Sequence, residues 1–227
     1  MVRFRLSPRL TRLAFWIGGA ALAFGVFLEI TDELLEPGRL QPLDEAVLRL
    51  VAGLRVGWLN AVAVDVTALG SHTLVVLHSV LAFAILLMLR DRRAALQLAA
   101  ASAGAGALTL FTKGYLERAR PEVVPRLVDV TGYSYPSGHS VSAAAMYLTI
   151  GFLVARHLKS IRARVLVLTL FVLVIGLVAM SRVYLGVHYP SDIASGASLG
   201  AAWAFLLAGA FSLVERHEQP DQEHAAG

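Results

Sequence analysis

The stretch that decides the fold is PSGHSVSAAAMYLTIGFLVA, residues 136–155, which joins a short polar cluster to an apolar run. No charged residue occurs between Ser140 and Ala155. With its polar end included, the stretch reaches the length of about 20 residues that a helix needs to cross a bilayer. It therefore predicts a membrane-spanning helix with polar residues gathered at one end.

Five more stretches lack charged residues over a similar length. With the first they predict six transmembrane helices, at Leu13–Ile30, Thr73–Leu89, Ala94–Thr112, Ser140–Ala155, Val165–Met180 and Ile193–Val214. The composition agrees, because 57% of the 227 residues are hydrophobic and only 16% are charged, against about 25% in soluble domains. The mean hydropathy is +0.66. We expect an all-α, polytopic membrane bundle that forms a single domain over residues 1–227.

The basic segment 1–12 and the first apolar stretch resemble a signal peptide. That stretch is longer than the 7–15 residues of a typical signal core, and no small-residue cleavage site follows it. We therefore expect a helix that stays in the protein. Of the 20 Lys and Arg residues, twelve fall on the side of the N-terminus and eight on the other. The positive-inside rule then predicts that segment 1–12 and tail 215–227 are cytoplasmic, with the protein in the cell (inner) membrane.

Residues 31–70 have a different pattern from the six apolar stretches. Apolar residues recur at helical spacing at Leu43, Val47, Leu50 and Leu54. This pattern favours an amphipathic helix in the outer membrane interface, or else a short buried helix packed on the bundle. A spanning helix is not expected here, because the run is interrupted by charges at Arg49, Arg55 and Asp65.

The charge pattern and the missing residue types narrow the range of functions. The net charge is +4, but no basic stripe with interleaved aromatic residues suggests nucleic-acid binding. The chain has no cysteine, so disulfides, cysteine-bound zinc and thiol catalysis are excluded. No cluster of Asp, Glu and His has the spacing of metal ligands. We expect no metal and no other cofactor.

Three polar clusters stand at the ends of predicted helices. They are Lys113 with Arg120-Pro121, then Pro136-Ser137-Gly138-His139, then Ser181-Arg182 with His188 and Asp192. Helices that alternate in direction bring all three to the extracytoplasmic side. Cations at membrane depth are costly and usually functional, and Lys and Arg suit phosphate oxygens. For each of these cations considered alone, the alternative to a phosphate-binding role is a side chain that snorkels to the membrane interface.

The second and third clusters add two further kinds of group. Ser137 is a candidate N-cap, and a helix start beside Gly138 offers free amide groups to an anion; the alternative is an ordinary cap. Asp192 lies one helical turn after His188, so its carboxylate can hold one imidazole N–H and leave the other nitrogen as a nucleophile. The alternative is a capping aspartate beside an interfacial histidine.

These clusters resemble the signature of the type 2 phosphatidic acid phosphatase superfamily, and the resemblance spans residues 113–192. It implies that His188 attacks phosphorus, that Asp192 orients His188, and that His139 acts as acid and then as base. It also implies a phosphate-binding set made of Lys113, Arg120, Ser137, Gly138 and Arg182. The cations then take the electrostatic role of a metal.

The expected function is a metal-independent phosphatase that acts on a lipid phosphate or lipid diphosphate at the outer leaflet through a phosphohistidine intermediate. Candidate substrates in the family are undecaprenyl diphosphate, phosphatidylglycerol phosphate and phosphatidic acid. A lipid-linked phosphotransferase with the same site is the alternative, followed by an anion or lipid transporter and a vanadium haloperoxidase. The expected partners are the substrate lipid and the bilayer. The oligomeric state is unknown from the sequence.

Overall fold

The computed structural model describes residues 7–36, 38 and 40–214. The basic residues of segment 1–6 and the tail from Glu215 lie outside this described part. The described residues form eight helices and no strand. The helices are α1 (Pro8–Leu35), α2 (Gln41–Ala52), α3 (Gly57–Ala68), α4 (His72–Met88), α5 (Arg92–Leu116), α6 (Gly138–Ala155), α7 (Ile161–Tyr184) and α8 (Pro190–Val214).

Short polar residues fix where several helices begin. The side chains of Ser7, Ser71 and Asp91 accept hydrogen bonds from the backbone N–H three residues later, at 3.3, 3.3 and 3.0 Å. These bonds satisfy amide groups that have no partner inside the helix. α8 begins at Pro190, where the missing N–H of proline costs nothing.

The six predicted stretches all lie within helices of the structure, apart from one terminal residue, and the all-α membrane bundle is confirmed. α1, α5, α6, α7 and α8 are each long and apolar enough to cross a membrane. α4 is shorter and meets the same criterion only together with α3, across a bend of 47°. The chain therefore has five candidate spans, or six when α3 and α4 count as one.

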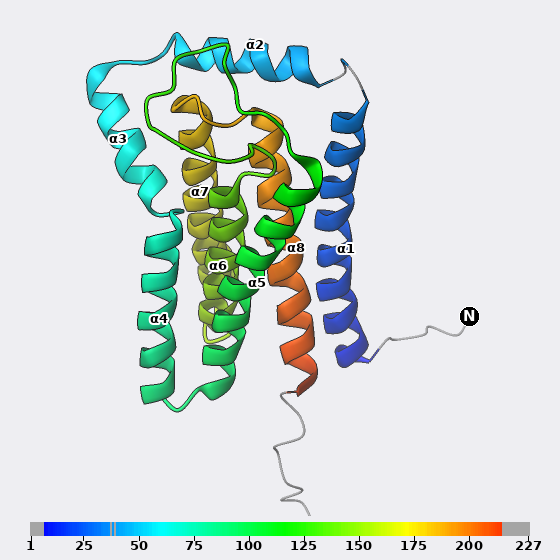
Figure 1. Ribbon diagram of the computed structural model, residues 1–227. Helices are drawn as coiled ribbons and strands as arrows, with labels where there is room; N and C mark the ends of the chain where they lie inside the picture. The colour runs from blue at the N-terminus through cyan, green and yellow to red at the C-terminus, as the bar shows by residue number, and fades with distance from the viewer. Residues whose placement is uncertain (1–6, 37, 39, 215–227) are drawn as a thin grey trace, which may run out of the picture.

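The segment 31–70 differs in part from what the sequence led us to expect. α2 lies across one end of the bundle, whereas α3 turns down along α7 and leads into α4 (Figure 1). Residues 57–68 thus belong to a bent span and not to an interfacial helix. Arg55 does not interrupt this span, because it lies before α3 and donates to the backbone oxygens of Tyr184 and Pro125 at 2.9 and 2.8 Å.

α2 combines the two alternatives considered for it. Leu48 is fully buried against the bundle, whereas Leu43 and Leu50 are 62% and 70% exposed. One face is therefore packed on the ends of α7 and α8. The other presents apolar side chains outward, as a helix at a membrane interface does.

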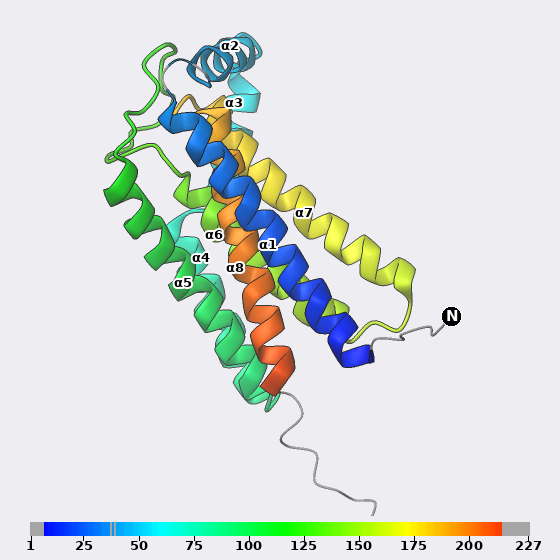
Figure 2. The ribbon, with the colours of Figure 1, turned by 90° about the vertical axis from the view of Figure 1, so that its right-hand side faces the viewer.

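Small residues allow the central helices to approach one another closely. A Cβ atom on Gly196 of α8 would lie 2.7 Å from the backbone oxygen of Ser137, at the start of α6. Gly200 meets the backbone of Val141 in the same way. Gly196 and Gly200 therefore serve the close packing of α6 and α8 within the chain. α6 and α8 pack along each other, and α1 covers α8 (Figure 2).

The outer surface of the bundle is apolar. Leu166, Leu170, Leu173 and Leu177 on α7 are all more than half exposed, as are Leu110 and Phe111 on α5. Soluble proteins rarely expose apolar patches of this extent. The polar residues of the three motifs gather instead at the end of the bundle where α5 ends and α6 and α8 begin.

Candidate active site

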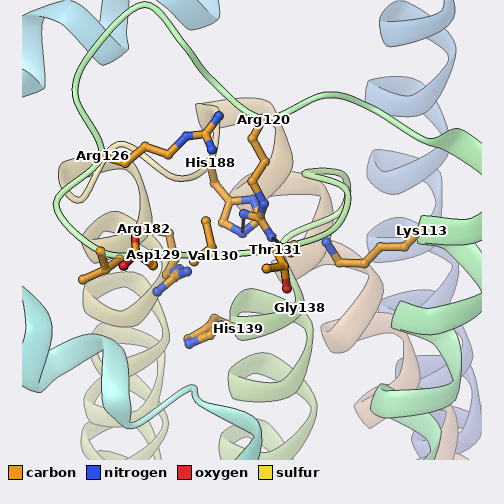
Figure 3. Close-up of a pocket in the computed structure, with 11 residues that line it drawn as sticks. Lys113, Arg120, Arg126, Asp129, Val130, Thr131, Gly138, His139, Arg182 and His188 are labelled. Carbon is orange, nitrogen blue, oxygen red and sulfur yellow. Dashed lines mark hydrogen bonds between the residues drawn. The ribbon is translucent and has the colours of Figure 1, made fainter.

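A cavity of about 560 Å³ lies at this end of the bundle. Figure 3 shows that its walls come from α5, the loop after it, α6, α7 and the segment before α8. It is lined by Lys113, Arg120, Arg126, Val128, Asp129, Val130, Thr131, Gly138, His139, Arg182 and His188. All three sequence motifs therefore contribute to one cavity.

His188 is held by a carboxylate from the following helix turn. Its Nδ1 lies 3.3 Å from Oδ2 of Asp192, and both side chains are almost fully buried. Ser134 donates a short hydrogen bond to the same oxygen, and the backbone N–H of Tyr189 donates to it at 2.9 Å. A carboxylate held from several sides keeps the proton on Nδ1, so the lone pair of His188 is on Nε2.

The other ring nitrogen of His188 faces the guanidinium group of Arg120, with 3.2 Å between Nη1 and Nε2. Burial lowers the pKa of His188 to about 4, although the neighbouring carboxylate of Asp192 raises it. Burial also lowers the pKa of Arg120 from its ordinary value, but an arginine remains protonated. His188 is therefore neutral at pH 7 and has a nucleophilic nitrogen beside a fixed cation.

Lys113 and Arg182 approach the cavity from opposite helices (Figure 3). Nζ of Lys113 donates a short hydrogen bond to the backbone oxygen of Tyr133, and Nη1 of Arg182 donates to Oγ1 of Thr67 at 2.8 Å. In the described part of the chain, no hydrogen bond engages Nη2 of Arg182. These contacts fix the cations and leave donor capacity for an anion.

The start of α6 lies at the cavity, with Gly138 and His139 among the lining residues. Ser137 occupies the N-cap position, but its side chain makes no capping bond. Its hydroxyl is buried without a partner among the described residues, and Ser137 does not line the cavity. The helix start is thus open to an anion through its backbone, whereas the expected cap bond of Ser137 is not formed.

The eight site residues proposed from the sequence fall into two groups. Six of them line the cavity, namely Lys113, Arg120, Gly138, His139, Arg182 and His188. Asp192 lies behind His188 and is fully buried, and Ser137 is buried behind Gly138. Asp192 therefore acts on an anion only through His188.

Arg118 is the most important residue that the sequence reasoning did not single out. Its Nη1 donates to Asp192 Oδ1 at 2.6 Å, and its Nη2 donates to Asp44 Oδ2 of α2 at 2.7 Å. Its guanidinium carbon also lies 4.1 Å from the ring centre of Tyr189. Burial opposes the charge, but the two carboxylates raise the pKa of Arg118 above its ordinary value. The only sequence signal was a second arginine two positions before Arg120.

Ser134, Thr67 and Arg126 were also missed. Ser134 donates a hydrogen bond to Asp192, and Thr67 accepts one from Arg182. Arg126 lines the cavity. Ser and Thr residues of loops and helices carry no pattern that sets these two apart from ordinary caps. Their roles depend on contacts between residues that are far apart in the chain.

The charges around the cavity favour an anion. Its lining holds four cationic side chains, those of Lys113, Arg120, Arg126 and Arg182, and one carboxylate, that of Asp129. Within the described ranges, no three side chains of His, Cys, Asp and Glu gather as metal ligands. Fixed cations around a neutral imidazole can bind a phosphate group and stabilise charge that moves during its transfer.

Comparison with known proteins supports this description. A protein of Bacillus subtilis named phosphatidylglycerophosphatase B is 31% identical over 195 residues, which cover 86% of this chain and 96% of that protein. A decaprenylphosphoryl-5-phosphoribose phosphatase of Mycobacterium tuberculosis is 36% identical over 115 residues, 49% of this chain and 58% of that protein.

A solved structure has the same fold. It is described as a transmembrane PAP2 type phosphatidylglycerolphosphate phosphatase from Bacillus subtilis, and it matches with a TM-score of 0.81 and 30% identity. The match covers 87% of this chain and 98% of that one. The family model of the PAP2 superfamily, the type 2 phosphatidic acid phosphatases, matches residues 94–214, which include all three motifs. The chain therefore belongs to the PAP2 superfamily, as its motifs predicted.

Proposed function

We propose that this membrane-integral enzyme removes the terminal phosphate from a lipid phosphate or lipid diphosphate without a metal ion. One observation supports this proposal above the others. The neutral imidazole of His188, held by Asp192, meets a cavity lined by four cationic side chains. This arrangement provides a nucleophile and a binding site for the phosphoryl oxygens in one place.

In the first half of the reaction, Nε2 of His188 attacks phosphorus and the bond from phosphorus to the lipid oxygen breaks. The N–P bond places a positive charge on the ring, which Asp192 stabilises through Nδ1. His139 gives its proton to the departing lipid oxygen. Arg120 leaves Nε2 and binds a phosphoryl oxygen, as do Lys113, Arg182 and the Gly138 amide.

In the second half, a water molecule attacks the phosphohistidine. His139, now neutral, accepts a proton from this water, and the N–P bond breaks with its electron pair returning to Nε2. Inorganic phosphate leaves and both histidines regain their starting states. If another acceptor replaced water at this step, the same site would perform phosphoryl transfer.

The substrate class follows from the place of the cavity. It lies at the end of an apolar bundle, so the phosphate of a lipid reaches it while the tail stays in the bilayer. The names of two relatives point to a phosphatidylglycerol phosphate or a decaprenylphosphoryl-5-phosphoribose. The start of α1 and the end of α8 lie at the opposite end (Figure 1). With the basic loops inside, the cavity faces the extracytoplasmic side.

The test is phosphate release by the purified protein with a chelator present, from phosphatidylglycerol phosphate, phosphatidic acid and undecaprenyl diphosphate. We expect turnover without added metal and a stoichiometric release of inorganic phosphate. His188→Ala should lose roughly 10³-fold or more of kcat, and Lys113→Ala roughly 10²-fold. His72→Ala, at the exposed start of α4, is the matched control and should retain full activity.

Two outcomes would contradict the proposal. Full turnover in His188→Ala would exclude it as the nucleophile, and a strict requirement for a divalent metal would exclude the metal-free reaction. The same assay on sealed right-side-out vesicles, with a short-chain substrate that does not cross them, tests the orientation. Turnover there only after permeabilisation would place the cavity on the cytoplasmic side.

A further inference from the structure

A second and larger cavity, of about 820 Å³, lies at the end of the bundle opposite the candidate active site. Its lining residues come from the first turns of α1, α5 and α7 and from the last turns of α6 and α8. Figures 1 and 2 show these helix ends together, away from α2. None of its lining residues belongs to the three motifs, so the proposed phosphatase reaction leaves this cavity without a role.

One wall of this cavity is aromatic and apolar. The rings of Trp16 and Phe152 lie 5.0 Å apart, and Phe15 packs edge-on against Trp16 at the same distance. Phe211 and Leu168 extend this wall. A hollow of this kind suits a hydrocarbon chain better than a small hydrophilic ion.

The lining of this cavity also holds polar groups that no described residue satisfies. Gln97 of α5 lines the cavity and is only 5% exposed. No hydrogen bond joins its side chain to any described residue, and Nε1 of Trp16 is also buried without a partner. A buried N–H group without a partner, such as that of Trp16, costs roughly 1–3 kcal/mol, and polar residues inside membrane spans, such as Gln97, are usually functional. These unpaired groups indicate a ligand with hydrogen-bonding oxygens.

The rim of the cavity is basic. The described lining holds four arginines, Arg12, Arg93, Arg156 and Arg164, and one carboxylate, that of Asp91. This carboxylate is already used, because one oxygen accepts from the backbone N–H of Ala94 at 3.0 Å and the other pairs with Arg156. Arg12 and Arg164 add positive charge to this rim, which favours an anion.

We propose that this cavity binds an anionic phospholipid, with the phosphate at the arginine rim and Gln97, and the first part of an acyl chain along the aromatic wall. An apolar wall next to a basic rim matches a lipid, whereas free phosphate would use only the rim. The site is separate from the proposed reaction and does not depend on it. The bound lipid stabilises the end of the bundle where α1, α6, α7 and α8 meet.

The test uses the purified full chain in neutral detergent. Thermal unfolding is followed as phosphatidylglycerol, phosphatidylcholine or inorganic phosphate is added, and lipid retained on the protein is measured by native mass spectrometry. We expect phosphatidylglycerol to raise the unfolding midpoint and to be retained, with much smaller effects from the other two. Gln97→Leu and Arg164→Gln should each weaken phosphatidylglycerol binding roughly tenfold, as loss of one charge-assisted hydrogen bond predicts.

Two features keep this test independent of folding and of catalysis. Arg162→Gln removes an arginine of the same helix turn that does not line the cavity, and it should bind phosphatidylglycerol as the unchanged protein does. Without lipid, Gln97→Leu should unfold no earlier than the unchanged protein, because the Gln97 side chain makes no hydrogen bond to a described residue and leucine suits an apolar bundle. Equal binding in all three variants would overturn the proposal. An equal response to inorganic phosphate, or to phosphatidylcholine, would also overturn it.

Discussion

His188 shows how a buried residue can be prepared for attack on phosphorus. Burial favours the neutral imidazole, and Asp192 opposes that effect only in part. The carboxylate does not make His188 cationic at rest, but it fixes the proton on Nδ1 and stabilises the positive ring formed during the reaction. The low pKa and the fixed tautomer together keep Nε2 unprotonated across the whole neutral range, with Arg120 facing it.

This environment predicts the pH dependence of activity. His188 has a pKa of about 4, below the ordinary value of about 6.5, so it becomes protonated only in acid. The acid limb of kcat/KM should therefore have its midpoint well below pH 6. An acid midpoint near 6.5, measured on a short-chain lipid phosphate, would contradict the buried neutral state of His188.

The Asp192→Asn variant tests the same pH dependence of kcat/KM. Because the carboxylate raises the pKa of His188, its removal should not move the acid limb toward neutral pH. The rate should nevertheless fall by roughly 10²–10⁴-fold, since the amide neither stabilises the phosphohistidine nor fixes the tautomer. A shift of the acid limb upward in this variant would show that another group titrates there.

At the level of single residues, the sequence predicted which residue types and motifs form the site better than it predicted the contacts between them. The pairing of His188 with Asp192 was expected from their spacing of four residues, although His188 lies just before α8 and meets Asp192 across the start of that helix. Ser134 joins the same carboxylate from a separate loop, and no spacing rule relates residues 134 and 192. The buried, uncapped state of Ser137 was equally out of reach, since it depends on how closely Gly196 approaches.

At the level of helices, Arg118 links α2 to the start of α8. It bridges Asp44 and Asp192, and Asp44 also accepts from the backbone N–H of Ser191 at 2.9 Å. All four residues are buried or nearly so. The position of the Asp192 carboxylate therefore depends on a helix that lies outside the three motifs.

Removal of this bridge should affect stability and rate together. Arg118→Gln leaves two buried carboxylates without their cation, which costs roughly 3–5 kcal/mol of stability. It should also lower kcat more than it changes KM, because Asp192 touches no substrate. Arg118→Lys should recover part of kcat, and adding Asp44→Asn to Arg118→Gln should recover stability but not rate.

The control for this prediction is Arg49→Gln, which removes an exposed ion pair with Glu45. Surface pairs of this kind contribute roughly 0–1 kcal/mol, so neither kcat nor the unfolding midpoint should change appreciably. If Arg118→Gln behaves like Arg49→Gln, Arg118 does not position Asp192.

Long uncharged runs made the spanning helices predictable, because the bilayer sets their length. α3 was not predicted, since Arg55 and Asp65 break the apolar run around it. Only the structure shows that Arg55 is bound by loop oxygens and that Asp65 is exposed. The break between α3 and α4 also has a tertiary cause, because Tyr147 of α6 donates to the backbone oxygen of Leu69.

In the whole molecule, helices of alternating direction bring three distant motifs to one cavity and leave a second cavity at the other end. That the three motifs share one end of the bundle could be derived from the sequence, because this needs only the number of crossings between them. The shape of the cavities could not, since both are formed by side chains from several helices. The apolar exterior places both within reach of lipids.

The central claim is that a phosphoryl group resides on His188 between the two halves of the reaction. The most direct test quenches the protein in alkali within milliseconds of adding an activated phosphate ester, and locates the modification by mass spectrometry. His139→Ala should accumulate the intermediate, because the ester leaves without an acid while attack by water lacks its base. We predict a phosphohistidine at His188, absent in His188→Ala. A phosphoryl group on another residue, or turnover with no protein-bound phosphate, would contradict the account.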